Sequence, residues 1–168
     1  VIDATGLDLV PGFVDVHTHY DAQLFFEASA SPSSWHGVTT VLTANCGFAR
    51  APSKPEDVEW LVLMLSKVEG MSSSALIEGV PFRGGSLGEY LALLDGRIGV
   101  NMASYIGHAA VRRWAMGAAA SERTATADEI VLMQSLVDEA MQQGALGLST
   151  SQLDIHADHE GRPVPPNL

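Results

Sequence analysis

Two histidines one residue apart are the feature of the sequence with the clearest chemical meaning. His17 and His19 close an apolar run, residues 13–19, which follows a Pro-Gly turn and reads as a buried strand. Because side chains two apart on a strand point to the same side, both imidazoles share a face with the Asp15 carboxyl. Two imidazoles at the carboxyl end of a strand suit a divalent transition metal, usually zinc. The alternative for so short a motif is one core histidine and one surface histidine.

The single cysteine of the sequence, Cys46, offers a third ligand. It lies near the end of residues 38–47, a segment rich in β-branched residues that predicts the next strand. In a parallel sheet this places the thiol at the same edge as the histidine pair, where a thiolate could ligate one zinc ion or bridge two. A lone buried cysteine is more often a small apolar side chain, and the neighbouring histidines are what favour the ligand role.

Other titratable residues have more than one possible role. Asp21 either orients one imidazole through its N–H or caps the next helix. His108 ends a later strand and is a further ligand, a hydrogen-bond partner of a ligand or a structural histidine, with the last two roles preferred. His156 and His159 lie in a polar, proline-rich loop, where exposed histidines without a metal are common. Asp15 is expected to be a hydrogen-bonded core carboxylate that holds neighbouring loops.

Metal-assisted hydrolysis is the chemistry that fits these residues. A bound zinc ion lowers the pKa of water to about 7 and polarises the carbonyl of an amide. The sequence has no G-x-S-x-G nucleophile elbow, no P-loop and no G-x-G-x-x-G fingerprint. No residue of the chain is a convincing base for the proton of the attacking water, so the catalytic residue is unassigned.

Strands and helices are expected to alternate along the chain. Four mainly apolar segments predict strands: 13–19, 38–47, 98–106 and 145–150. Three segments with apolar residues at helical spacing predict helices that end at a glycine: 55–70, 86–96 and 126–144. Two of these helices begin with a capping box, and the segments 72–85 and 116–124 read as loops.

Apolar strands that alternate with helices indicate parallel βα units and an α/β fold. An open doubly wound sheet would fit whole within 168 residues. A (β/α) barrel usually takes about 250 residues, so the chain would hold its first half. The nucleotide-binding form of the open sheet is disfavoured because its glycine fingerprint is missing after the first strand. A barrel instead builds its active site at the carboxyl ends of the strands, where the histidine pair falls.

Composition excludes several classes of function. Nine Lys and Arg against 20 Asp and Glu give a net charge of −11, which disfavours binding to nucleic acid or to an acidic membrane surface. No apolar run approaches the roughly 20 residues that span a bilayer. A single cysteine cannot form an internal disulfide, which favours a cytoplasmic location.

The sequence begins without methionine inside an apolar segment and ends in a loop. We therefore expect that it is a piece of a longer protein and that it packs against the remainder of that protein.

Several motifs resemble one family. The segment PGFVDVHTH, residues 11–19, resembles the first-strand signature of the amidohydrolase superfamily. Within it, further segments are similar to the N-acyl-D-amino-acid deacylase (D-aminoacylase) branch: GVTTV at 37–41, NCGFARAP at 45–52, GH at 107–108 with Arg112, and GALGLST at 144–150. The resemblance covers nearly the whole chain, and the segment around Cys46 is more specific than the histidine pair.

The resemblance implies an architecture and a ligand set. Residues 10–168 would form the N-terminal half of a TIM-like (β/α)8 barrel, and residues 1–9 the last strand of a flanking small β-sandwich domain. It implies that His17 and His19 ligate one metal position and that Cys46 ligates or bridges to the tighter one, with one or two divalent ions, zinc being expected. The remaining histidine ligands, the catalytic Asp and the groups that bind the substrate carboxylate are expected beyond residue 168.

The implied activity is hydrolysis of the linear amide of an N-acyl-D-amino acid by metal-activated water. Residues 151–166 depart from the better-known deacylases, which carry a loop with Tyr and Pro there, and this loop could line the pocket. Two alternatives within the superfamily are a cyclic-amide hydrolase, like dihydroorotase or hydantoinase, and an isoaspartyl-dipeptidase-like enzyme. The alternative outside enzymes is an inactive truncated product that holds metal weakly or not at all.

Overall fold

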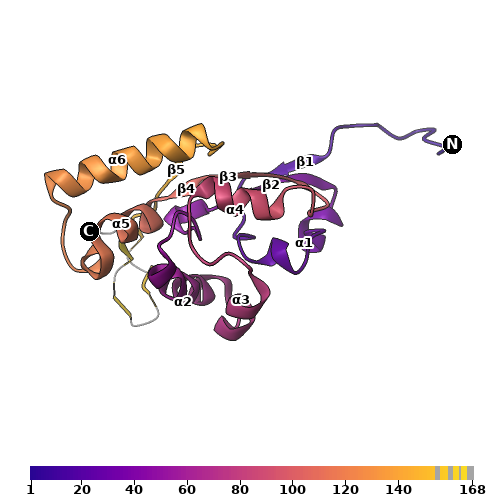
Figure 1. Cartoon of the computed structure of the whole chain (residues 1–168). Coiled ribbons are helices and arrows are strands. Elements are labelled where there is room, and N and C mark those ends of the chain that lie inside the picture. The colour runs from indigo at the N-terminus through magenta and orange to yellow at the C-terminus, as the bar shows by residue number, and fades with distance from the viewer. Residues whose placement is uncertain (154–155, 159–160, 163, 166–168) are drawn as a thin grey trace.

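A parallel sheet runs through the middle of the molecule, and its strands follow chain order (Figure 1). Strand β1 (Phe13–Asp15) pairs with β2 (Val38–Thr43), and β2 pairs with β3 (Asn101–Ser104). After a single intervening residue, β4 (Ile106–Gly107) pairs in parallel with β5 (Leu148–Ser149). All three pairings are parallel, which confirms the predicted mixed α/β class and brings the carboxyl ends of the strands to one edge.

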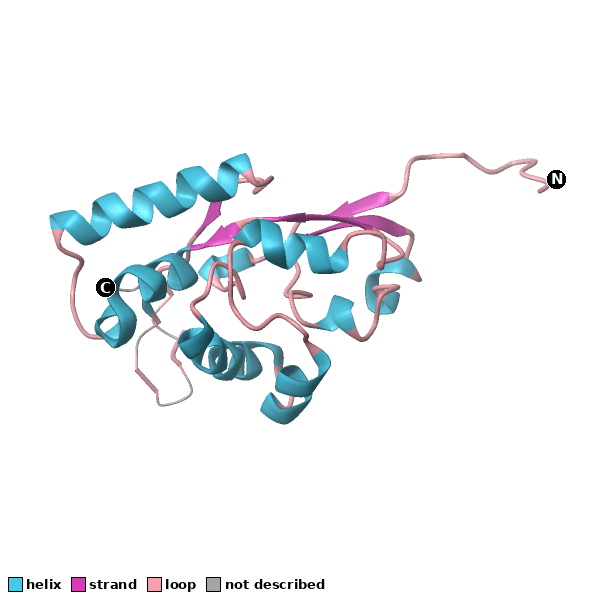
Figure 2. Cartoon of the chain, in the orientation of Figure 1, coloured by secondary structure: helices cyan, strands magenta, loops and turns pink. Residues whose placement is uncertain are grey.

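The computed structural model describes residues 1–153, 156–158, 161–162 and 164–165. Its helices connect and flank the strands (Figure 2): α1 (Ser31–Ser34), α2 (Val58–Glu69), α3 (Ser73–Gly79), α4 (Leu87–Leu94), α5 (His108–Met116) and α6 (Ala127–Gln142). Short 3-10 turns cover Gln23–Phe25, Asn45–Gly47, Pro55–Asp57 and Gly117–Ser121. Within the described part of the chain, none of these helices has the length and apolar character needed to cross a bilayer.

Both predicted capping boxes are present. The Glu89 amide donates to Ser86 Oγ, and the Ser86 amide donates to the Glu89 carboxylate at 2.8 Å, so two otherwise unpaired amides of α4 are satisfied. Thr126 and Glu129 repeat this exchange at the start of α6. These pairs fix where the two helices begin, because each cap satisfies backbone donors that the helix itself cannot pair.

Two apolar clusters hold the helices to the sheet. The first joins the sheet to α4, with Val41, Ile106 and Tyr90 fully buried within it. The second packs the inner side of α2 against the start of α5 and against Phe48, which follows the cysteine. The Tyr90 hydroxyl donates to the Asp21 carbonyl at 2.7 Å, so α4 also holds the segment that follows the histidine pair. The segments that carry the histidine pair and Cys46 therefore lie against the packed core.

The structure corrects several predicted boundaries. The strand predicted over 38–47 ends at Thr43 because the chain turns through left-handed conformations at Ala44 and Cys46. The strand predicted over 98–106 begins at Asn101, and the loop predicted over 72–85 contains α3, whose Leu76 is fully buried. Residues 116–124, also predicted as a loop, contain the Gly117–Ser121 turn. Helix α5 was not predicted, although its alanine-rich sequence favours a helix.

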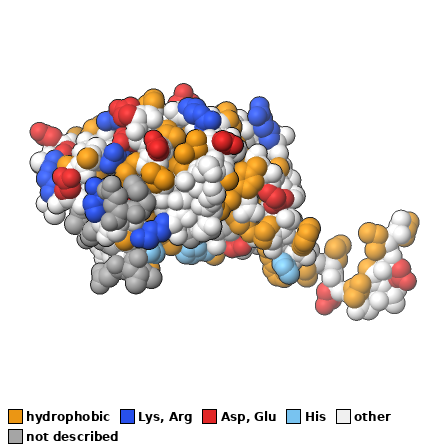
Figure 3. Space-filling view, turned by 90° about the horizontal axis from the view of Figure 1, so that it is seen from below, with side chains coloured by type: hydrophobic (Ala, Val, Ile, Leu, Met, Phe, Trp, Pro, Cys, Tyr) orange, Lys and Arg blue, Asp and Glu red, His pale blue; other side chains and the backbone are white. Residues whose placement is uncertain are grey.

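The first ten residues extend away from the body of the molecule (Figure 3) and contain no strand in this structure. Their apolar side chains are exposed, including Ile2, Leu7 and Leu9. The exposure continues through β1 and just beyond it, where Phe13 and Val16 are 64% and 61% exposed. The assignment of residues 1–9 to a flanking sandwich domain therefore stays a prediction.

Candidate metal centre

Three predicted ligands converge just beyond the ends of β1 and β2. The ligand atoms of His17, His19 and Cys46 all lie within 4.8 Å of one another, and Cys46 Sγ is 3.2 Å from His17 Nε2. The two imidazole rings meet edge to face with centroids 5.5 Å apart. Ligand atoms around one tetrahedral zinc ion lie roughly 3.5 Å apart, so small side-chain rotations would suffice to share a cation.

The chemistry of the His19 imidazole and the Cys46 thiol fits the binding of a cation. His19 Nδ1 is buried and has no hydrogen-bond partner among the described residues, an arrangement that is costly unless a ligand satisfies the nitrogen. Burial lowers the pKa of His19, and the nearby His17 and His156 lower it further, which favours the neutral imidazole that metal ligation requires. Burial also raises the pKa of the Cys46 thiol, and a neighbouring cation would reverse that effect.

A strained turn presents the thiol. Ala44, Cys46 and Gly47 have φ values of 61°, 57° and 80°, in the left-handed region. Left-handed backbone costs a residue with a side chain roughly 1–2 kcal/mol, so the surroundings must hold Ala44 and Cys46 in place. Strain of this kind collects at functional sites, where it sets the direction of one side chain.

Asp21 is one of the groups that hold this turn. Its Oδ2 accepts a hydrogen bond from the Ala44 amide at 3.1 Å, and the residue is only 1% exposed. Burial raises the pKa of Asp21 to about 6, while the Ala44 amide and the Arg50 charge act in the opposite direction. The predicted role of Asp21 as the partner of an imidazole stays a prediction.

Asn45 and Thr18 tie the turn to the segment that carries the histidines. Asn45 Nδ2 donates to the Thr18 carbonyl at 3.1 Å and to the Leu42 carbonyl at 3.0 Å. The Thr18 hydroxyl donates to the same Leu42 carbonyl at 2.8 Å. Thr18 lies between the two histidines, so these bonds fix the cysteine turn relative to both imidazoles.

A model of the amidohydrolase family matches residues 1–163. The chain belongs to the amidohydrolase family. This match confirms that the sequence motifs resemble this family, and the matched residues include the histidine pair, the cysteine turn and β5.

Proteins similar to this amidohydrolase chain include named deacylases. The N-acyl-D-aspartate deacylase of Alcaligenes xylosoxydans xylosoxydans is 36% identical over 151 residues, which are 89% of this chain and 28% of the relative. A solved structure of D-aminoacylase, an enzyme with a binuclear metal centre, aligns with a TM-score of 0.64 at 35% identity over 83% of this chain and 27% of its own. The N-acyl-D-glutamate deacylase of Bordetella bronchiseptica, in complex with zinc and a phosphonate inhibitor, aligns with a TM-score of 0.64 at 30% identity and the same coverage.

The amidohydrolase chain spans about a quarter of the length of the relatives it matches. Its mixed α/β fold is similar to that of D-aminoacylase over the aligned part.

The other predicted site residues of the amidohydrolase chain lie outside the three-residue cluster. His108 begins α5, and its Nδ1 lies 3.0 Å from Thr150 Oγ1. Burial lowers the pKa of His108, and the Arg112 charge adds to this effect. Asp15 accepts bonds from the His17 amide and from Ser33 Oγ, both at 3.3 Å, as expected of a hydrogen-bonded carboxylate.

His156 lies closer to the cluster than the sequence indicated. Its ring is 5.1 Å from the Phe48 ring, which is 6.2 Å from the His19 ring, and its Nδ1 lies 3.2 Å from Ser151 Oγ. Phe48 therefore contacts both His156 and His19, and His156 lies close enough to His19 to lower its pKa. His159 lies outside the described residues.

Sequence reasoning missed Ser149, which contacts the cysteine turn from β5. The sequence feature that could have identified Ser149 is its place at the end of a predicted strand, on the same sheet edge as the candidate ligands.

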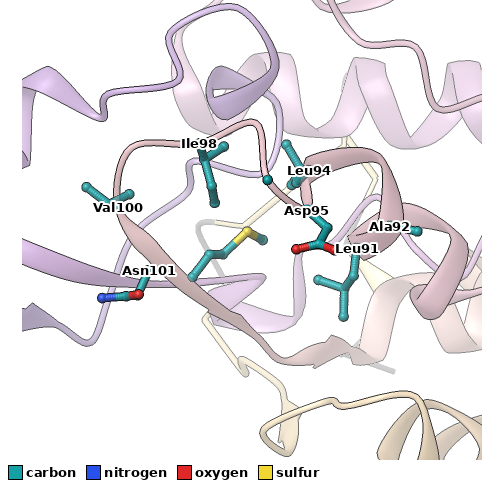
Figure 4. Close-up of a pocket in the computed structure, with 9 residues that line it drawn as sticks. Leu91, Ala92, Leu94, Asp95, Ile98, Val100 and Asn101 are labelled. Atoms are coloured by element: carbon teal, nitrogen blue, oxygen red, sulfur yellow. The ribbon is translucent and has the colours of Figure 1, made fainter.

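A separate hollow of about 520 Å³ lies between α4 and β3 (Figure 4) and contains none of the candidate ligands. Most of the residues that line it are apolar, and Asp95 and Asn101 are polar.

Proposed function

We propose that this chain supplies the first metal ligands of an amidohydrolase that removes the acyl group from N-acyl-D-amino acids. The observation that carries the proposal is the convergence of two imidazoles and a thiol, whose potential ligand atoms lie within 4.8 Å of one another, while His19 Nδ1 is buried without a partner among the described residues. The deacylases among the similar proteins support the substrate class, and the zinc in one of them supports zinc.

Within the proposed enzyme, residues 10–168 form the first half of a TIM-like (β/α)8 barrel, and residues 1–9 end a flanking β-sandwich. The parallel strands in chain order support this architecture. The second half, with the remaining ligands and the catalytic Asp, is expected beyond residue 168. The single cysteine favours a cytoplasmic location.

The residues of this chain hold and shape the proposed site. His17 and His19 would ligate one metal position, and Cys46 would ligate or bridge to the tighter one. A divalent cation bound there supplies a Lewis acid for the amide carbonyl and lowers the pKa of water to about 7. Asp21 and Asn45 keep the thiol facing the imidazoles, and Phe48 covers one side of His19 with an apolar ring.

Hydrolysis by the intact protein tests this function. Metal-free protein is reconstituted with zinc and given N-acetyl-D-amino acids, their L enantiomers, hydantoins and β-aspartyl dipeptides. We expect zinc-dependent release of free D-amino acids. Faster turnover of hydantoins or β-aspartyl dipeptides would contradict the substrate class, and no zinc-dependent hydrolysis of any compound would favour the inactive product.

A matched pair of variants locates the activity. His17→Asn removes a proposed ligand and should abolish zinc-dependent hydrolysis. His36→Asn removes an exposed histidine that follows α1, outside the three-residue cluster, and should leave the rate unchanged. Equal loss in both variants would contradict the assignment of the site.

A further inference from the structure

We propose that Ser149 on β5 is a positioning residue for the Cys46 thiol, so that docking of β5 makes the metal centre competent. The proposal rests on the proposed function in one respect, namely that Cys46 ligates the metal. It assigns a role to a side chain more than a hundred residues away from the cysteine in sequence. This role is distinct from ligation, because Ser149 acts on the backbone around Cys46.

The Ser149 hydroxyl binds the cysteine turn on both sides of Cys46. It accepts a hydrogen bond from the Gly47 amide at 3.0 Å, across 102 residues of sequence. It donates to the Ala44 carbonyl, across 105 residues. The Ser149 hydroxyl therefore fixes the distance between Ala44, where the turn begins, and Gly47, where it ends.

Two other side chains among the described residues hold the turn before the cysteine. Asp21 binds the Ala44 amide, and Asn45 Nδ2 donates to the Thr18 carbonyl on the histidine segment and to the Leu42 carbonyl on β2. The bond between Gly47 and Ser149 restrains the backbone directly after Cys46. Because Cys46 has a φ of 57°, its side chain keeps its direction only if both neighbouring peptides are held.

Strand pairing brings Ser149 within reach of the turn. In the β4–β5 register Ser149 pairs with Gly107, and Gly107 lies against the turn. A Cβ at Gly107 would be 2.6 Å from the Ala49 Cβ and 2.8 Å from the Gly47 carbonyl oxygen. The missing side chain lets β4 approach the turn closely, and β5, paired beside it, then reaches the turn with a short hydroxyl. The same two strands therefore support both the sheet and the thiol.

The metal readout compares Ser149→Ala with Ser149→Thr in the intact protein. Cobalt(II) replaces zinc, because a thiolate ligand gives a charge-transfer band that imidazole ligands do not. Loss of a group that orients a ligand typically lowers metal affinity by about 10–100-fold. We expect this loss and a weakened band in Ser149→Ala, with recovery in Ser149→Thr, which keeps the hydroxyl. Ser135→Ala removes an exposed hydroxyl on α6 and should match the parent.

A second readout needs no metal. Hydrogen exchange of the Gly47 amide should be faster in metal-free Ser149→Ala than in the parent, because that amide loses its acceptor. Far-ultraviolet circular dichroism like that of the parent would show that the fold persists.

Two results would overturn the proposal, and they differ in what else they affect. If Ser149→Ala keeps the parent's cobalt affinity, charge-transfer band and Gly47 exchange rate, Ser149 does not position the thiol, and the proposed function is untouched. If the cobalt-loaded parent itself has no charge-transfer band, Cys46 is no ligand, and the metal centre of the proposed function falls with this inference.

Discussion

At the scale of single residues, the candidate site depends on backbone that its own sequence disfavours. Ala44 and Cys46 both adopt positive φ, although neither is glycine. Long-range hydrogen bonds to Asp21 and Ser149 offset this strain. Residues that hold the turn should therefore affect metal binding almost as strongly as the ligands do.

Asp21 offers a test of this support. Asp21→Ala leaves the buried Ala44 amide without its acceptor, and we expect it to lower the free energy of unfolding by about 1–3 kcal/mol. Asp21→Asn keeps an acceptor oxygen in the same place and should lose less. Urea unfolding of both variants measures the difference, and equal losses would show that the bond to Ala44 is not what Asp21 contributes.

The grouping of His17, His19 and Cys46 could be predicted from sequence, because strand periodicity puts the two histidines on one side and a parallel sheet brings the end of the next segment to the same edge. The strand itself ends at Asp15, so both histidines lie just after it. Their role as ligands stays a prediction. The turn that delivers Cys46 could not be predicted, because its partners lie 23 and 105 residues away. Local propensity predicts a strand that continues through Cys46, and tertiary hydrogen bonds end that strand at Thr43 instead.

At the scale of elements, the approach of β4 to the cysteine turn is tight enough to exclude a methyl group. We expect Gly107→Ala to cost about 1–3 kcal/mol through overpacking and to weaken zinc binding, because the Gly47 backbone must move. Gly99→Ala is the matched control, since its Cβ would meet its nearest neighbours at an ordinary 3.6 Å. Thermal unfolding and zinc titration measure both effects, and similar behaviour of the two variants would contradict this packing argument.

The start of α6 should make stability depend on pH. The Arg123 guanidinium and the Thr126 cap lower the pKa of Glu129 from 4.5 to about 2. Because the folded-state pKa is the lower one, this stabilisation is complete above pH 4.5 and is lost as the pH falls towards 2. Glu129→Gln keeps an acceptor for the cap and removes the charge, so its unfolding midpoint should vary less with pH over this window. An unchanged pH profile in that variant would contradict the pairing.

The capping boxes show what sequence predicts well at this scale. Ser86 with Glu89 and Thr126 with Glu129 are local pairs, so their helices begin where the sequence predicts. Helix α3 was missed because its serines resemble a loop, and its position depends on burial of Leu76 in the core.

At the scale of the whole molecule, apolar side chains stay exposed on β1, an edge of the three-stranded sheet, and near β5, an edge of the two-stranded sheet. Phe13 and Val14 on β1 are 64% and 55% exposed, and Leu146 and Leu148 near β5 are 52% and 50% exposed. Unpaired strand edges with apolar neighbours invite association. Residues 1–168 expressed alone should therefore self-associate and bind a hydrophobic dye, as light scattering and dye fluorescence can measure. A monodisperse chain without dye binding would contradict the expectation that these edges pack against further protein.

The central claim is that His17, His19 and Cys46 share one cation. X-ray absorption at the zinc edge of the intact protein tests it most directly. We predict one sulfur at about 2.3 Å together with imidazole nitrogens at about 2.0–2.1 Å, and loss of the sulfur signal alone in Cys46→Ala. A zinc environment without sulfur in the parent protein would contradict the account.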